Sequence, residues 1–270
     1  MNVLSCILGI YPHLEVYVRC FYRRAFIDVL RKKEDKAFWL STILKPYPMI
    51  HQARLLQILF LPKTSFGVNF NAAIYDRFTN AALADLGNAF QLLFEYAKWS
   101  DDNIISVFDE TIGTPALWSP PNISALLLNC SPIITEKVLI SKAINNRFSE
   151  IVCISHHLLV ASIRATRSIK PASDCIWSFM EKLNPSDRVY LASQLLNSLK
   201  NALFDMVDMG VEPITEVEAA LEAISQFTEN ILNLALVSLR ENRLSSGPGI
   251  HEVNKDTISK EPEFSPAIEE

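Results

Sequence analysis

Residues 36–60 read KAFWLSTILKPYPMIHQARLLQILF, and this stretch decides the fold. Its first half places apolar residues at helical spacing beside Trp39: Ala37, Leu40, Ile43 and Leu44. Pro46 then disfavours helical geometry at Lys45, because the proline ring restricts the residue before it. Pro48 is well placed as the first residue of a second helix, whose apolar stripe follows: Met49, Ala53, Leu56 and Phe60. The stretch therefore predicts two amphipathic helices joined by a sharp corner.

The composition is that of a folded helical protein. With 49% hydrophobic and 20% charged residues, general disorder is excluded. Only 7 glycines in 270 residues argue against glycine-rich nucleotide loops and against a turn-rich β architecture. The net charge of -5 gives no reason to expect nucleic acid as a main ligand. Five cysteines, without a CxxC pair, favour a reduced intracellular protein.

The pattern along the chain predicts an all-α fold: about ten helices packed as a helical array of antiparallel helix pairs. Residues 61–80 break the helical period and predict one long loop with room for a short helix. No fixed sequence period is visible, so no named repeat family is identified. We expect a single helical domain over residues 1–242 and a disordered tail over residues 243–270, where Ser, Gly, Pro, Lys and Glu dominate.

Three arginines of the first strong helix, Arg19, Arg23 and Arg24, precede the charged run 31–36. Together they are consistent with a basic patch for an acidic partner. The alternative is a solvated helix face and loop of mixed charge, which we favour.

Four acidic residues near one another are candidate metal or catalytic carboxylates: Asp101, Asp102, Asp109 and Glu110. Neither a histidine nor a glycine-rich loop accompanies them. Acids in the first turn of a helix also have a sufficient structural role, because they interact favourably with the helix dipole. We therefore interpret them as structural.

Cys153, His156 and His157 allow three interpretations. On a helix, Cys153 and His157 lie one turn apart and are able to share a metal ion, but zinc needs three or four protein ligands. A Cys/His catalytic pair would need an exposed, activated thiolate. We favour the third interpretation, a buried cysteine beside histidines on a polar helix face. The sequence thus predicts no catalytic residue, cofactor site or metal site.

The corner also carries a family resemblance. The runs at 37–40, 43–49 and 52–56 (AFWL, ILKPYPM and QARLL) resemble the F-box only protein 47 family. The resemblance begins near Leu14, with Arg19 and Phe21 in the preceding helix, and resumes at residues 85–110. It is specific in the corner, diffuse elsewhere and weak after about Ile144.

The resemblance implies an F-box adaptor of a cullin-type ubiquitin ligase with a germ-cell or meiotic role, located in the nucleus or cytoplasm. Its implied partners are the ligase complex, reached through the linker subunit, and an unknown target protein, with no nucleic acid, small-molecule substrate or membrane. The F-box of the family lies upstream of the matched region, and we expect none in residues 1–13, which are too few to hold one. The alternative is a helical scaffold of a nuclear or chromosomal assembly without ligase function.

A protein-binding surface is predicted at the proline corner and its second helix, because aromatic residues and arginine commonly anchor interfaces. Its residues are Trp39, Lys45, Tyr47, His51 and Arg54. The competing interpretation is that Trp39 and Tyr47 simply pack the corner, and we favour it.

Overall fold

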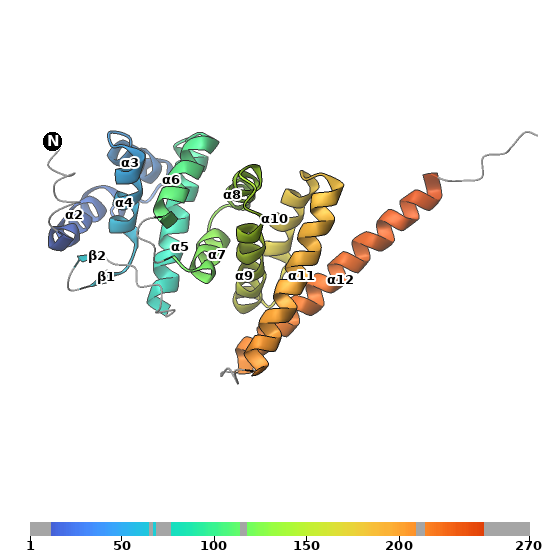
Figure 1. Ribbon diagram of the computed structural model, residues 1–270. Helices are drawn as coiled ribbons and strands as arrows, with labels where there is room; N and C mark the ends of the chain where they lie inside the picture. Colours follow the sequence, from blue (N-terminus) through green and yellow to red (C-terminus); the bar gives the residue numbers. More distant parts are fainter. Residues whose placement is uncertain (1–11, 65–66, 69–76, 114–117, 209–213, 246–270) are drawn as a thin grey trace, which may run out of the picture. The chain divides into compact units, whose positions relative to one another are not determined.

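The computed structural model describes residues 12–64, 67–68, 77–113, 118–208 and 214–245 (Figure 1). These residues form eleven α-helices, which confirms the predicted all-α class and the antiparallel helix pairs. The chain divides into two compact units, Met1–Thr228 and Glu229–Glu270, and the boundary falls inside the last helix. The helices and shorter helical turns are η1 (Pro12–Leu14), α2 (Glu15–Tyr22), η2 (Arg23–Ile27), α3 (Lys33–Leu44), α4 (Met49–Phe60), α5 (Arg77–Gln91), η3 (Leu92–Tyr96), α6 (Asp101–Gly113), α7 (Pro120–Asn129), α8 (Pro132–Ile144), α9 (Phe148–Thr166), α10 (Lys170–Glu181), α11 (Pro185–Asp208) and α12 (Ile214–Ser245).

Within Met1–Thr228 the helices form two layers. In one layer α4 packs on α6, α6 on α8 and α8 on α10; in the other α5 packs on α7, α7 on α9 and α9 on α11. Successive helices alternate between the layers, so each helix pair rests on the next pair along the chain (Figure 1). The core lies between the layers and includes four fully buried phenylalanines: Phe90, Phe108, Phe179 and Phe227.

The proline corner differs from its predicted geometry at both prolines. Lys45 keeps helical angles (φ −50°, ψ −34°), and its N–H still donates to the Ser41 carbonyl at 2.9 Å. The predicted distortion at Lys45 is therefore wrong: α3 stops because Pro46 has no N–H with which to continue the helix. Pro48 is the residue before α4 rather than its first residue, and its carbonyl accepts from the N–H groups of His51 (2.9 Å) and Gln52 (3.0 Å).

The predicted loop 61–80 holds a pair of short strands and the start of a helix. Strands β1 (Lys63–Thr64) and β2 (Gly67–Val68) pair antiparallel, and α5 begins at Arg77. Residues 69–76 lie outside the described part of the chain, as do residues 246–270. Helix α12 extends to Ser245, and the disordered tail and the domain limit at 242 stay predictions.

Helix α9 is the central helix of its layer. It is, among the described residues, the one helix long and apolar enough to cross a membrane, and more than half of that stretch is buried inside the protein. A core helix passes the same test of length and composition. The packing of α9 between α7 and α11 accounts for its apolar character.

Candidate protein-binding surface

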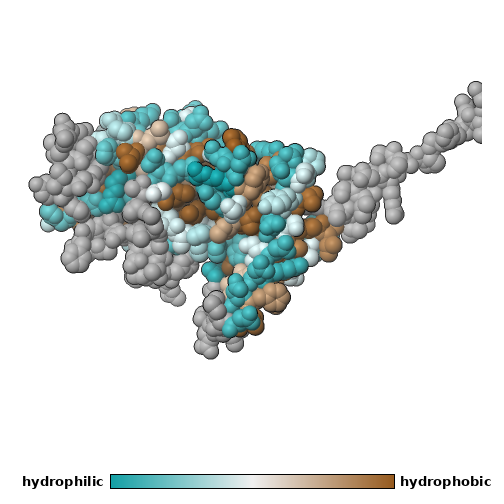
Figure 2. Space-filling model, in the orientation of Figure 1, coloured by the Kyte–Doolittle hydropathy of each residue, from teal (hydrophilic) through white to brown (hydrophobic). Residues whose placement is uncertain are grey.

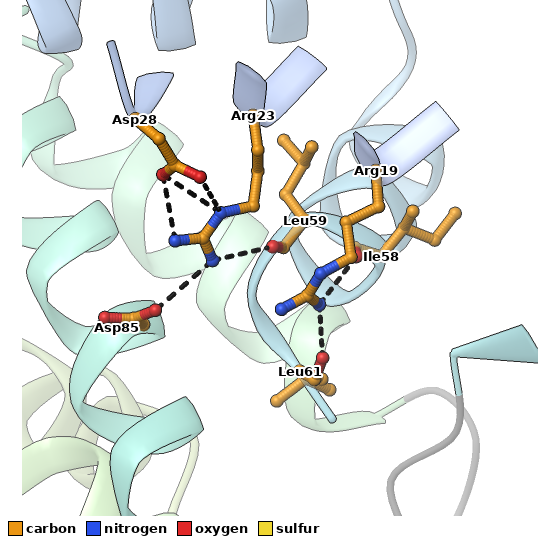
Figure 3. A network of polar contacts seen from close by, with 7 residues as sticks. All are labelled: Arg19, Arg23, Asp28, Ile58, Leu59, Leu61 and Asp85. Carbon is orange, nitrogen blue, oxygen red and sulfur yellow. Dashed lines mark hydrogen bonds and ion pairs between the residues drawn. The ribbon is translucent and has the colours of Figure 1, made fainter. Parts of the chain in front are cut away.

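Two arginines of the first helical stretch hold the C-terminal end of α4 (Figure 3). The Arg19 guanidinium donates to the carbonyls of Ile58, at 3.1 Å, and Leu61. The Arg23 guanidinium donates to the Leu59 carbonyl at 3.3 Å. The last carbonyls of a helix have no partner within the helix, and positive charge there opposes the negative end of the dipole. These arginines therefore fix α4 against α2.

Arg23 also binds the carboxylates of two acidic side chains. Its Nε donates to both carboxylate oxygens of Asp28 at 3.0 and 3.1 Å, and its Nη1 reaches Asp85 of α5 at 3.2 Å (Figure 3). Burial alone would lower the pKa of Arg23, but its hydrogen bonds to Asp28 and Asp85 and the negative charges of these acids together raise the pKa. The favoured prediction of a solvated helix face is therefore wrong for Arg19 and Arg23, which are engaged inside the fold, whereas Arg24 is exposed.

A second polar network joins α2, α4 and α6. Arg54 pairs with Glu15, whose side chain is only 1% exposed, through an Nε–Oε1 contact of 3.1 Å. Arg54 also donates to the side-chain oxygen of Gln57 at 3.1 Å, and Gln57 donates to the Thr111 carbonyl at 2.7 Å. A buried carboxylate needs such a partner, because an unpaired charge inside a protein is strongly destabilising.

The five residues of the predicted surface have different environments. Trp39 is half-buried and packs on Phe26, with ring centroids 4.8 Å apart. Tyr47 is half-buried, and its carbonyl accepts from the Gln52 side chain at 2.7 Å. Lys45 is exposed, and His51 is half-buried. Arg54 belongs to the internal ion pair with Glu15, and partner binding through these residues stays a prediction.

Sequence reasoning missed the rings around Trp39. Phe26 packs on it at a tilt from the η2 turn, and the neighbouring Phe38 is 60% exposed. Helical spacing places Phe38 outside the apolar stripe of α3, which was an available signal for an exposed aromatic residue. Contact between Phe26 and Trp39 depends on how η2 packs against α3, and the spacing of residues along the sequence does not predict that packing.

The Cys153, His156 and His157 cluster lies on α9, against α11. His156 is buried, and its Nδ1 lies 3.0 Å from the Ser198 Oγ of α11. Burial lowers the pKa of both histidines; that of His157 falls to about 4, with His156 contributing. Burial raises the pKa of the Cys153 thiol, which keeps it protonated. The favoured prediction is corrected in both parts: Cys153 is half-buried rather than buried, and α11 covers the face of α9 that carries the histidines.

Polar side chains of α9 and α11 line a shallow groove of about 440 Å³ at this cluster. From α11 come three side-chain amides and a carboxylate: Gln194, Asn197, Asn201 and Asp205. Over the described part of the chain, no three His, Cys, Asp or Glu side chains are grouped so that they could hold a metal ion. The groove thus offers hydrogen-bonding groups, and the neutral Cys153 thiol is not an activated nucleophile.

The acidic residues of α6 lie beside α8. Asp101 forms an ion pair with Lys137, and a groove of about 500 Å³ runs between these helices past Asp102 and Asp109. The Ser100 hydroxyl accepts from the N–H of Asn103 at 3.3 Å, so Ser100 caps the start of α6.

On the face shown in Figure 2, exposed hydrophobic residues form separate small areas among hydrophilic ones.

Comparison with known proteins decides the family. A family model described as "FBXO47, ARM repeats" matches residues 1–222. The chain belongs to the F-box only protein 47 family. It is 37% identical to mouse F-box only protein 47 and 35% identical to the human protein over 142 residues, which are 51% of this chain.

The match covers 32% of the mouse relative and 31% of the human one, so the chain spans about a third of the length of these curated relatives. No solved structure matches the chain. Armadillo repeats stack helices into a solenoid, and the two layers of helices in Met1–Thr228 have this arrangement. The family match thus identifies the repeats as armadillo repeats. The sequence alone did not identify a repeat class, because no fixed period is visible in it.

Proposed function

We propose that the chain is a non-catalytic protein-binding module, the target-recognition region of an F-box-type adaptor. The observation that carries the proposal is the family match over residues 1–222, in which the matched part is the helical-repeat array. A stack of helix pairs makes a broad surface on which another protein can bind. Such a module performs no chemistry of its own.

The adaptor role works through proximity. A target held on the repeat array is kept near the ubiquitin-transfer machinery, which raises its effective concentration there. We propose that the connection to the cullin runs through the linker subunit of the ligase, in the nucleus or cytoplasm of germ cells during meiosis. Since the chain spans about a third of its curated relatives, this connection is the part of the proposal in greatest need of a test.

The second candidate is a helical scaffold of a nuclear or chromosomal assembly. One observation favours the scaffold: the part of the chain that the family model matches is described as armadillo repeats, which are a binding array. A scaffold needs only the array, whereas an adaptor must also reach the linker subunit and the cullin.

Affinity isolation from germ-line extract separates the two. The tagged chain is bound to resin, and retained proteins are quantified by mass spectrometry against the tag alone and against an unrelated helical-repeat protein. Enrichment of the linker subunit and a cullin supports the adaptor. Reproducible enrichment of other proteins without those two supports the scaffold, and no enrichment over the controls would contradict both.

A further inference from the structure

Five aromatic rings form a connected cluster over the η2 turn, α2 and α3. We name it the N-terminal aromatic patch, and its members are Phe21, Tyr22, Phe26, Phe38 and Trp39. Neighbouring ring centroids along the cluster lie 4.8 to 5.8 Å apart, from Phe21 through Phe26 and Trp39 to Phe38. The rings are therefore in mutual contact and behave as one surface.

Much of this patch faces solvent. Phe21 and Phe38, at its two ends, are each 60% exposed, and the nearby Val29 is 65% exposed. Large apolar side chains grouped on a surface commonly mark a site of protein interaction, and aromatic residues carry much of the binding energy at such sites. The patch has the composition of an interface centre.

The stretch of chain that carries the patch is positively charged, although the whole chain carries -5. Residues 12–62 hold nine Lys and Arg against four Asp and Glu. Arg19, Arg23 and Arg54 are engaged inside the fold, but Arg24 is exposed one turn after Phe21. The connection between the two ring-bearing stretches is also basic and exposed: Arg31, Lys32 and Lys33. A partner with acidic side chains matches this rim.

Two other binding partners of the aromatic patch, a second copy of the chain and single-stranded nucleic acid, fit less well. A second copy of the same patch would bring two positive rims together, which like-charge repulsion opposes. Single-stranded nucleic acid also uses aromatic rings with basic residues. A nucleic-acid backbone needs a continuous positive track, which the exposed Glu34 and Asp35 interrupt one helical turn before Phe38, whereas a peptide is able to place its carboxylates against Arg24 and the basic connection alone.

We propose that the N-terminal aromatic patch docks an acidic segment of a partner protein that inserts apolar side chains among the rings. The inference rests on the proposed function, since both need a protein partner, and it adds the surface and the chemistry of the segment. Phe21 and Phe38 contact the apolar side chains of the segment, and Arg24 with the basic connection contacts its carboxylates.

Three probes test the proposal by fluorescence anisotropy. The first is a peptide of about 14 residues with Phe and Leu at helical spacing and Glu elsewhere. The second carries Lys for every Glu, and the third is an oligouridylate of about ten nucleotides. We expect the acidic peptide to bind with a Kd of about 1–100 µM, and the Lys peptide and the oligouridylate to bind at least about tenfold more weakly.

The variant F21A/F38A should weaken binding of the acidic peptide at least about tenfold. F204A removes a ring of α11 that is 65% exposed and serves as the matched control, with binding unchanged. Circular dichroism of each variant confirms that it is folded. Tighter binding of the oligouridylate, a dimer in sedimentation that F21A/F38A dissolves, failure of the acidic peptide to bind, or equal binding by both variants would each overturn the proposal.

The affinity isolation from extract keeps the two proposals apart. If F21A/F38A retains the same proteins as the unsubstituted chain, the aromatic patch is excluded and the binding module stands. If the unsubstituted chain retains nothing beyond the controls, the binding module itself fails.

Discussion

Helices α2–α4 and helices α9–α11 both belong to the stacked array, yet they differ in the burial of their ion pairs and in the grouping of their exposed aromatic rings. In the first region, Arg19 and Arg23 turn inward to helix carbonyls while Phe21 and Phe38 face solvent. In the second region, Arg188 likewise donates to helix-end carbonyls, the exposed Phe204 lies among polar side chains rather than in a ring cluster, and other polar side chains line the groove.

Two kinds of contact hold the helix pairs of both regions in place. Apolar burial between α9 and α11 is non-directional and gains free energy in proportion to area. The arginine contacts of α2 are directional, because each needs a particular carbonyl or carboxylate. What the first region adds is an ion pair with a buried carboxylate and a ring cluster that faces solvent.

The largest expected effect is on the buried ion pair of the first region. Arg54→Ala removes the guanidinium that pairs with the Glu15 carboxylate, whose side chain is 1% exposed. We expect the free energy of unfolding to fall by about 3 kcal/mol, measured by urea denaturation. Lys182→Ala, which removes a pair with Glu136 from a side chain 55% exposed, is the control and should cost under about 1 kcal/mol. Equal losses would remove the contrast between the regions.

The next effect concerns the contact of α5 with α7, which joins the two regions. A Cβ added at Gly87 would lie 2.7 Å from the Asn129 carbonyl oxygen. The Asn129 backbone cannot move away without a large free-energy cost. Gly87→Ala should therefore lower the free energy of unfolding by about 2 kcal/mol in the same measurement. At Gly113 the added Cβ would meet nothing within 4 Å, and Gly113→Ala should leave stability unchanged or slightly raised. A neutral Gly87→Ala would show that α5 and α7 are free to move apart.

The third effect belongs to the groove of the second region and depends on pH. The pKa of His157 is about 4 in the folded protein, below the ordinary value of 6.5. Between these values the unfolded chain binds the proton and the folded chain does not, so stability is full above pH 6.5 and is lost as pH falls towards 4. We expect a loss of about 3 kcal/mol over that window, smaller in His157→Leu but not abolished, because burial also lowers the pKa of His156. His51→Asn, in the first region, should retain the loss, and a pH dependence unchanged in His157→Leu would show that other groups cause it.

Features that depend on neighbouring residues could be predicted from the sequence. The helices on either side of Pro46 and Pro48 follow from spacing and proline chemistry, because both are properties of neighbouring residues. The family resemblance at the same corner was correct for the same reason, since it rests on short contiguous runs. Helix pairing followed from connections too short for any other arrangement.

Contacts between distant elements were beyond such reasoning. Arg19 reaches a carbonyl 39 residues away, and the helical period does not tell which polar residue meets a later helix end. His156 lies on a face that looks polar in α9 alone, and it is buried because α11 crosses that face. Periodicity assigns residues to faces, and tertiary packing decides which faces are covered.

The smallest expected effect asks whether the charges of the first region act as separate pairs or as a unit. Asp85→Asn removes one of the acidic partners of Arg23, at a side chain 50% exposed, and leaves Asp28 and the Leu59 carbonyl in place. If the contacts are separate, the cost is about 0.5 kcal/mol, as for other exposed pairs. A double-mutant cycle with Arg23→Gln measures the coupling directly, and we expect it to be equally small. A coupling above about 2 kcal/mol would mean that Asp85 orients the Arg23 guanidinium for its other contacts, so that α2, α4 and α5 are locked by one network.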